Sequence, residues 1–287
     1  MKKLLITVGL VLSALFLTGC EAINNMENIT IYTSSYPIEF VTKKLYGEHA
    51  KVYNMYPQGI DSSDYKLTDK QISDYANSDL IIYNGLSNEQ KYIVKMINKN
   101  NKLKIIDATS KIEYTSDINE IWINPSNLLK IAKNTKDGLD EYITSTLIRE
   151  EINDNYENLK VEISSIDADL KEMVENASDK TIVTSSNKLN FLTKYGMNVI
   201  SVDEATLTDK TLSDAKKALA TDSINYIFII KGEEKSKTVE DLLAANTSIQ
   251  TLEIDILNNI STEDKNDGKD YITIMNENID KFKQELY

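Results

Sequence analysis

The chain has 287 residues, of which 41% are hydrophobic and 27% charged, with three prolines and nine glycines, so it is neither collagen-like nor wholly disordered. Its formal net charge of −13 repels phosphate backbones, and we expect no binding of nucleic acid. One histidine, His49, and one cysteine, Cys20, exclude disulfide frameworks and His-rich zinc sites. Unless His49 lies in a site, they also exclude Ser-His-Asp and Cys-His catalysis, and we expect no enzyme.

The N-terminus has the pattern of a bacterial lipoprotein signal. Two lysines precede an apolar run at residues 4–17, which is too short to span a bilayer, and Leu-Thr-Gly-Cys at residues 17–20 resembles the lipobox. We expect residues 1–19 to be removed, Cys20 to be acylated and residues 20–27 to form a tether. The alternative is a core cysteine behind an ordinary signal peptide. The first reading places the protein on the extracytoplasmic face of the cell membrane, anchored in the lipid bilayer through Cys20.

After the tether, short apolar runs alternate with helix-like stretches. Runs that are apolar throughout are typical of parallel sheets covered on both faces. The first set of expected strands comprises residues 29–33, 52–56, 80–83 and 103–106, with helices at 38–46, 68–76 and 88–99. The second set comprises 181–184, 199–202, 226–230 and 251–254, with helices at 188–195, 209–220, 237–246 and 270–286. The pattern predicts an α/β fold of two Rossmann-like lobes with parallel sheets, at residues 28–143 and 179–287.

A regular apolar stripe separates the two sets. Its members alternate at spacings of four and three residues: Ile152, Tyr156, Leu159, Ile163, Ile166, Leu170, Met173 and Ala177. This period predicts one long amphipathic helix within residues 144–178. A coiled coil is the alternative, but the few heptads and the lobe that follows favour a single rigid helix packed along both lobes. The cleft between the lobes is then the default ligand site.

Several short motifs resemble those of one protein family in order and spacing. They are TSSYP at 33–37, PQG at 57–59, DYKLT at 64–68, DLIIYNG at 79–85, WINP at 122–125, TS at 184–185 and GKDYI at 268–272, with Met275 and Asn276. The chain resembles the cluster A-I substrate-binding lipoproteins, the zinc- and manganese-binding components of metal ABC importers. The resemblance runs from about residue 29 to the C-terminus. It implies two α/β lobes joined by one long rigid helix, as the periodicity also predicts.

The metal-ligand positions differ from those of the family. The resemblance implies one ligand in each of four segments, a histidine in most of them. The matching positions here are Ser63, Glu120, Ser186 and Asp255, and none is a histidine. His49 matches a turn before the second strand, where we expect an exposed histidine.

Two carboxylates and two hydroxyls are poor ligands for Zn²⁺, which prefers imidazole and thiolate. Hard cations accept oxygen, so the sequence implies at most weak binding of Mn²⁺, Zn²⁺ or Ca²⁺, with Glu120 and Asp255 as the metal ligands and no certain cofactor. Alternatively, the ammonium of Lys188 or Lys231 takes the place of the cation, because a buried carboxylate pair needs a counter-charge. Both lysines are otherwise ordinary solvated side chains.

The function implied is capture of a solute and its delivery to an ABC permease in the cytoplasmic membrane, without chemistry and as a monomer. Two alternatives stay open: a surface adhesin that uses the same fold, and a cleft that binds a non-metal ligand. Tyr36, Tyr56, Tyr65 and Trp122 fall near the segments that line the cleft in the family. Each of them either lines a ligand site or packs in the core.

Overall fold

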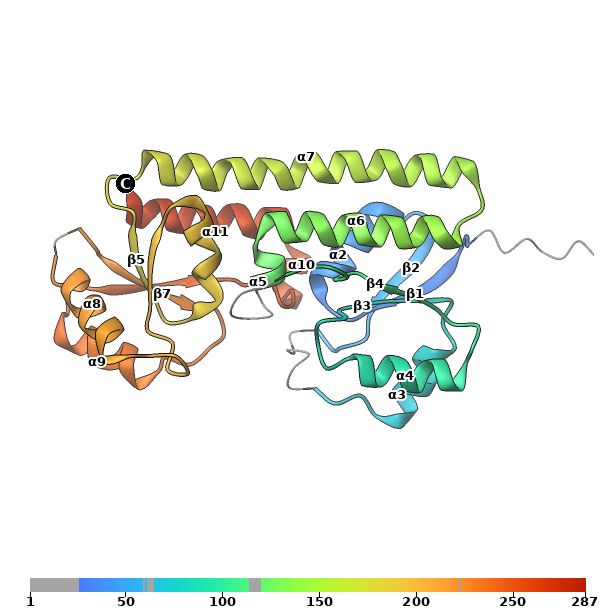
Figure 1. Ribbon diagram of the computed structural model, residues 1–287, viewed down its shortest axis with the longest axis horizontal. Helices are drawn as coiled ribbons and strands as arrows, with labels where there is room; N and C mark the ends of the chain where they lie inside the picture. Colours follow the sequence, from blue (N-terminus) through green and yellow to red (C-terminus); the bar gives the residue numbers. More distant parts are fainter. Residues whose placement is uncertain (1–25, 59, 61–64, 114–119, 222) are drawn as a thin grey trace, which may run out of the picture.

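The computed structural model describes residues 26–58, 60, 65–113, 120–221 and 223–287, which form two α/β lobes (Figure 1). The first lobe contains a four-stranded parallel sheet of order β2-β1-β3-β4. Its strands are β1 (Ile29–Thr33), β2 (Ala50–Asn54), β3 (Leu80–Tyr83) and β4 (Lys104–Asp107). The two central strands, β1 and β3, are the most apolar because helices cover both of their faces.

The helices of the first lobe begin at recognisable signals. They are α2 (Tyr36–Tyr46), α3 (Asp69–Ala76), α4 (Gln90–Lys99), α5 (Glu120–Ile123) and α6 (Pro125–Tyr142). A proline opens the first turn of α2 and of α6, where its missing N–H costs nothing. At α3, Thr68 and Gln71 form a reciprocal capping box. The sequence did not predict α6, although it is one of the longest helices.

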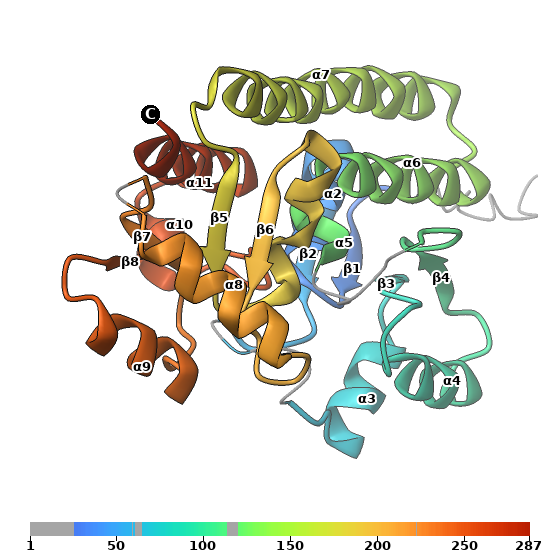
Figure 2. The same ribbon diagram turned by 60° about the vertical axis from the view of Figure 1, so that its left-hand side comes forward.

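The second lobe repeats this architecture. Its parallel sheet has the order β6-β5-β7-β8, with strands β5 (Thr181–Thr184), β6 (Asn198–Ser201), β7 (Tyr226–Ile230) and β8 (Gln250–Ile254). A 3₁₀ helix, η1 (Asn187–Tyr195), follows β5. The remaining helices are α8 (Asp209–Leu219), α9 (Lys237–Ala245), α10 (Thr262–Asn266) and α11 (Tyr271–Leu286). Figure 2 shows α8 and α9 on the far side of this sheet from α11.

One helix joins the lobes and packs against both. It is α7 (Thr146–Asn176), 31 residues long, and it lies across α2 and α6 of the first lobe and α11 of the second (Figure 1). Its buried residues continue the stripe seen in the sequence: Ile148, Ile152, Leu159, Ile163, Ile166, Leu170, Met173 and Val174. The prediction of two parallel-sheet lobes linked by one long helix is confirmed.

Apolar side chains gather in three clusters. The largest is continuous between the lobes and includes the stripe of α7. A second cluster lies between the first sheet and α3 and α4, where Ile72, Ile81 and Met96 are fully buried. A third lies between the second sheet and α8 and α9, around Val183 and Ile227. The helices that are far from α7 in Figure 1 therefore cover cores of their own.

Two expectations about the first lobe need correction. Met26, placed in the tether, is fully buried, and its carbonyl accepts a hydrogen bond from the Tyr46 hydroxyl. His49, expected to be exposed, has a side chain that is only 21% exposed. Its Nε2 lies 3.0 Å from Glu151 Oε2 on α7 and its ring packs beside Tyr46, because α7 passes over the turn before β2. Cys20 lies outside the described residues.

Within the described residues, no helix is both long enough and apolar enough to cross a membrane.

A buried carboxyl group lies near the carboxyl end of the first sheet. Glu89 is 4% exposed, and its Oε2 has no hydrogen-bond partner among the described residues. Burial raises the pKa of Glu89 from 4.5 to about 7, and the neighbouring hydroxyls of Ser34, Ser87 and Tyr56 act in the opposite direction. Glu89 is therefore largely protonated in the folded protein at mildly acidic pH.

The apolar stripe of α7 can be tested by truncating one of its buried side chains. Leu159→Ala removes a side chain that is 1% exposed. We expect it to lower the free energy of unfolding by about 2–5 kcal/mol, and each kcal/mol lowers the melting temperature by roughly 2–4 °C in a protein of this size. Val161→Ala, two residues away on the exposed face, is the matched control and should have almost no effect. Equal melting temperatures for the two variants would contradict the packing of α7.

The raised pKa of Glu89 predicts how the stability of the fold depends on pH. The folded state holds the proton more tightly than the unfolded state, so Glu89 destabilises the fold progressively as pH rises from about 4.5 to about 7. Glu89→Gln removes this cost. We expect the variant to be more stable than the wild type at pH 8 by about 3 kcal/mol, and the difference to shrink toward pH 5. Glu48→Gln, at an exposed position, serves as control in the same thermal unfolding series. A pH-independent difference would contradict the shifted pKa.

Candidate functional site

A pocket of about 340 Å³ lies between the lobes. Ser34, Tyr36 and Tyr56, which follow β1 and β2, form its wall on the first lobe, and Asn258 and Ile260, which follow β8, form the facing wall. We call it the inter-lobe pocket. Because loops after the carboxyl ends of parallel strands supply both walls, it has the position expected of a ligand site in α/β proteins.

A second hollow, of about 280 Å³, adjoins the inter-lobe pocket and shares Tyr36, Ile260 and Lys265 with it. Phe40 of α2 forms part of its wall, and the Phe40 ring stacks on Tyr271 of α11 with 5.5 Å between the ring centres. The two hollows form one groove along α2 with side chains of both lobes on its sides.

The aromatic residues suggested by the sequence divide between lining and packing. Tyr36 and Tyr56 line the inter-lobe pocket, and burial raises the pKa of both hydroxyls, which stay protonated. The Tyr65 ring packs nearly perpendicular to the Tyr56 ring, with 6.0 Å between the ring centres, and lies against the second cluster. Trp122 is buried and has a structural role: its indole N–H donates to the Ile256 carbonyl at 3.0 Å and to Asn258 Oδ1 at 3.1 Å.

The expected ligand positions have different fates in the fold. Ser63 lies outside the described residues. Glu120 is the first residue of α5, and the Trp122 hydrogen bonds hold this short helix against the segment that follows Asp255. The hydroxyl of Tyr271 also donates to the Trp122 carbonyl. The backbone therefore brings α5 of the first lobe to the end of β8 in the second.

Ser186 serves as a helix cap. It is 5% exposed, and its Oγ accepts a hydrogen bond from the Lys188 N–H at 3.3 Å at the start of η1. Its own N–H donates to Thr184 Oγ1 at 3.3 Å. These contacts fix Ser186 at the carboxyl end of β5, on the same edge of the sheet as Asp255.

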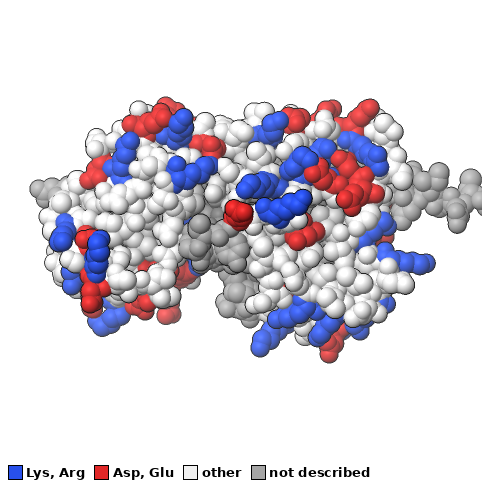
Figure 3. Space-filling model, in the orientation of Figure 1, with Lys and Arg blue, Asp and Glu red and all other residues white. Residues whose placement is uncertain are grey.

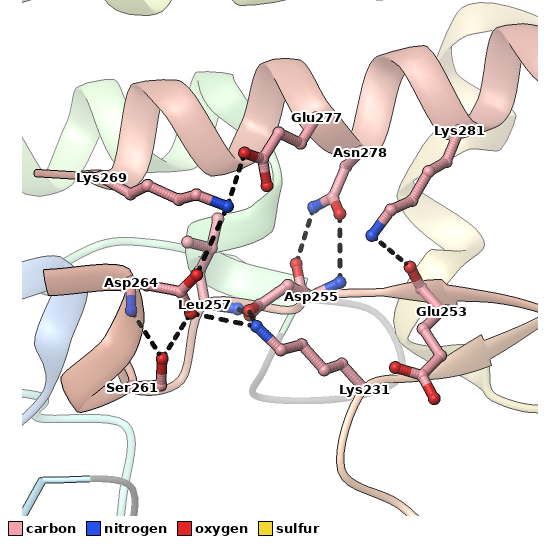
Figure 4. A network of polar contacts seen from close by, with 10 residues as sticks. All are labelled: Lys231, Glu253, Asp255, Leu257, Ser261, Asp264, Lys269, Glu277, Asn278 and Lys281. Carbon is pink, nitrogen blue, oxygen red and sulfur yellow. Dashed lines mark hydrogen bonds and ion pairs between the residues drawn. The ribbon is translucent and has the colours of Figure 1, made fainter. Parts of the chain in front are cut away.

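Asp255 lies in a dense network of polar contacts (Figure 4). Its Oδ2 accepts a hydrogen bond from Lys231 Nζ at 3.0 Å and its Oδ1 accepts from the Leu257 N–H at 2.8 Å. Asn278 of α11 holds the backbone on both sides, because its Oδ1 accepts from the Asp255 N–H at 3.1 Å and its Nδ2 donates to the Asp255 carbonyl at 2.7 Å. Asp255 is therefore held rigidly.

A second carboxylate, Asp264, meets the same ammonium. Lys231 Nζ lies 3.1 Å from Asp264 Oδ2, which also accepts a hydrogen bond from Ser261 Oγ at 2.6 Å. The bond from Ser261 lowers the pKa of Asp264, and Lys231 lowers it further. Burial disfavours the charged form of Lys231, but the two carboxylates outweigh it and raise the pKa of the lysine. The ion pair thus stays charged at neutral pH.

The structure distinguishes the two candidate lysines. Lys231 pairs with Asp255 and Asp264, whereas Lys188 pairs with Glu233. Asp264 was not predicted as a site residue from the sequence. The motif Ser-Thr-Glu-Asp at 261–264, which has the spacing of a helix N-terminal cap, marked an acid held close to the end of β8.

The described residues offer a poor donor set for a metal. Among them, no group of three or more histidine, cysteine, aspartate or glutamate side chains converges as a metal site would require. Asp255 and Asp264 already share an ammonium. On the face seen in Figure 3, basic and acidic side chains are intermixed over both lobes.

The chain is similar in sequence to bacterial zinc-binding proteins. The chain is 22% identical to the zinc-binding lipoprotein AdcA of Streptococcus pneumoniae over 311 residues, covering 99% of this chain and 61% of the relative. It therefore spans about three fifths of that protein. It is 21% identical to the high-affinity zinc uptake system protein ZnuA of Bacillus subtilis, covering 91% of this chain and 88% of the relative.

Solved structures share the fold. The Zn(II)-bound ZnuA-like domain of S. pneumoniae AdcA superposes with a TM-score of 0.72 at 22% identity, covering 90% of this chain and 99% of that one. The metal-dependent lipoprotein YcdH of B. subtilis gives a TM-score of 0.74 at 20% identity, with coverage of 90% and 99%. A family model, described as zinc-uptake complex component A periplasmic, matches residues 31–285. Since this match covers most of the chain, the protein belongs to that family.

Proposed function

We propose that this protein is the solute-binding component of an ABC importer. It captures a solute between its lobes and passes it to a permease in the cytoplasmic membrane, without chemical conversion. Membership of a zinc-uptake family supports this role, as does the described relative named as a zinc uptake system protein. The lipobox at residues 17–20 supports attachment through acylated Cys20 on the extracytoplasmic face. The proposal takes the protein as a monomer.

The inter-lobe pocket is the observation that carries this proposal. It is lined by segments of both lobes that follow parallel strands, and α7 fixes the two walls relative to one another. A long helix resists bending more than a pair of flexible strands does, so lobe closure is small. We expect the pocket to bind a ligand that fits it largely as it is formed.

We further propose that divalent metals bind this protein only weakly. Of the four ligand positions that the resemblance implies, Ser186 caps a helix and Asp255 is engaged by Lys231. This leaves Glu120 and Asp255 as the only carboxylates among those positions, too few for the closed nitrogen and sulfur shell that Zn²⁺ prefers. A hard cation such as Mn²⁺ or Ca²⁺ fits oxygen donors better.

The inter-lobe pocket favours a small polar organic solute as a second candidate ligand. A volume of about 340 Å³ is far larger than one metal ion needs and lies within the range of small-molecule sites. Tyr36, Tyr53 and Tyr56 offer ring faces, while Asn54 and Gln58 offer amide groups. Glu39, Lys43 and Lys265 add charged groups to the lining, and this mixture of aromatic, amide and charged side chains suits a polar organic solute.

Metal affinity can be measured by thermal unfolding of the chelator-treated protein with 100 µM Zn²⁺, Mn²⁺ or Ca²⁺. A dissociation constant near 100 µM gives about 0.4 kcal/mol, so we expect shifts of about 1–2 °C or less. A shift of more than about 5 °C would require a dissociation constant of roughly 15 µM or less and would contradict weak binding. If such a shift occurs, its loss in the variant Glu120→Ala with Asp255→Ala would locate the metal at these residues.

The organic ligand can be sought with a panel of amino acids, small peptides and sugars in the same assay. We expect at least one compound to stabilise the wild type and to lose its effect in Asn259→Trp, which fills the inter-lobe pocket. Asn266→Trp, at an exposed position of α10 outside the pocket, is the control and should keep the effect. Stabilisation that persists in Asn259→Trp would place the compound elsewhere.

A further inference from the structure

The register of the second sheet places a lysine beside a carboxylate. Ile230 of β7 pairs with Ile254 of β8, so the next residues along the two strands, Lys231 and Asp255, leave the sheet side by side. The Lys231 N–H donates to the Ile254 carbonyl at 2.9 Å, which extends the ladder by one bond. Gly232 then turns the chain away with a φ of 83°, a conformation that glycine adopts without strain. The position of Lys231 is therefore set by the backbone.

Two carboxylates from different segments converge on its ammonium. Asp255 follows β8, whereas Asp264 belongs to α10, and their side chains are only 16% and 12% exposed. Two half-desolvated acids that face one point repel each other unless a cation lies between them. Figure 4 shows the Lys231 ammonium at this point. Its Nζ lies 3.0 Å from Asp255 Oδ2 and 3.1 Å from Asp264 Oδ2.

All four oxygens of the two acids have partners. Asp255 Oδ1 accepts from Leu257, Asp264 Oδ2 also accepts from Ser261, and Asp264 Oδ1 lies 3.5 Å from Lys269 Nζ. Lys269 is balanced in turn by Glu277 at 2.8 Å. A metal ion would have to break several of these contacts and to expel a like charge before it gained a ligand.

We infer that the Lys231 ammonium is the resident cation of this edge of the sheet, and that a divalent metal binds Asp255 only by displacing it. The inference rests on the proposed function, because it explains the weak metal binding proposed there. It also makes Lys231 the residue that determines whether the end of β8 accepts a metal ion. Removing the ammonium leaves two converging carboxylates without a counter-charge, and a hard cation is then the natural replacement.

The test compares Mn²⁺ and Ca²⁺ binding to the wild type and to Lys231→Met, whose side chain has a similar length and no charge. Trp122, the single tryptophan, donates to the carbonyl of Ile256 next to Asp255, so its fluorescence reports binding at this edge. Isothermal titration gives the dissociation constants independently. We expect Lys231→Met to bind Mn²⁺ at least ten times more tightly than the wild type.

Three variants serve as controls. Lys188→Met removes an ammonium from the same edge of the sheet, where it pairs with Glu233, and should bind metal like the wild type. Lys231→Arg keeps the charge and should also leave the affinity unchanged. Adding Asp255→Asn to Lys231→Met should abolish the gain, because one of the two carboxylates is lost.

Equal affinities of Lys231→Met and the wild type would overturn the inference, and so would an equal gain in Lys188→Met, which would reflect net charge alone. If Lys231→Met is unfolded without metal by circular dichroism, recovery of the fold with millimolar Mn²⁺ supports the inference and failure to recover overturns it. Tight metal binding by the wild type would contradict the proposed weak binding, whereas the ratio between variant and wild type tests the role of Lys231.

Discussion

The architecture depends on the burial of one apolar stripe on α7. Residues such as Ile152, Leu159 and Leu170 are buried on α7, which contacts α2 and α6 of the first lobe and α11 of the second, and they belong to the largest core, which includes residues of both lobes. The opposite, polar face of α7 is exposed to water, so burial of the stripe fixes the rotation of α7 about its own axis relative to the lobes. The spacing between the sheets, and with it the inter-lobe pocket, follows from this packing.

In parallel sheets the loops that follow the strands lie together at the carboxyl edge. In the second lobe the carboxylates at this edge, Asp255 and Asp264, are neutralised by a lysine of the same lobe. Lys231 is covalently tethered beside Asp255, so its effective concentration there stays high whatever the ionic composition outside. A free metal ion competes with it only through its bulk concentration. If Lys231 has the role that we infer, the shape of this edge is independent of the metal supply, which suits capture of a different solute in the adjoining inter-lobe pocket.

Much of the fold was predictable from the sequence, and the errors in that prediction have physical causes. The central strands β1, β3, β5 and β7 have the predicted bounds because both of their faces are buried and the sequence is apolar throughout. The edge strands β2, β4, β6 and β8 differ by one or two residues, since their exposed positions carry polar side chains such as Lys51. Helix α6 was missed because Gly138 interrupts its pattern; this glycine lies so close to Ile106 that a Cβ would clash. The partnership of Lys231 with Asp264 depends on strand register and tertiary contact, which no local pattern encodes.

The division of the interior into three clusters affects how the molecule moves. The cluster under α3 and α4 and the cluster under α8 and α9 are separate from the one that includes α7. Elements that do not share side-chain packing can open independently, as cooperative units with their own local free energies. The amide protons of α3 or α9 can therefore exchange with solvent by local unfolding while the stripe of α7 stays closed. We expect a substitution that loosens one of the two outer layers to leave the distance between the lobes unchanged, because α7 packs on neither layer.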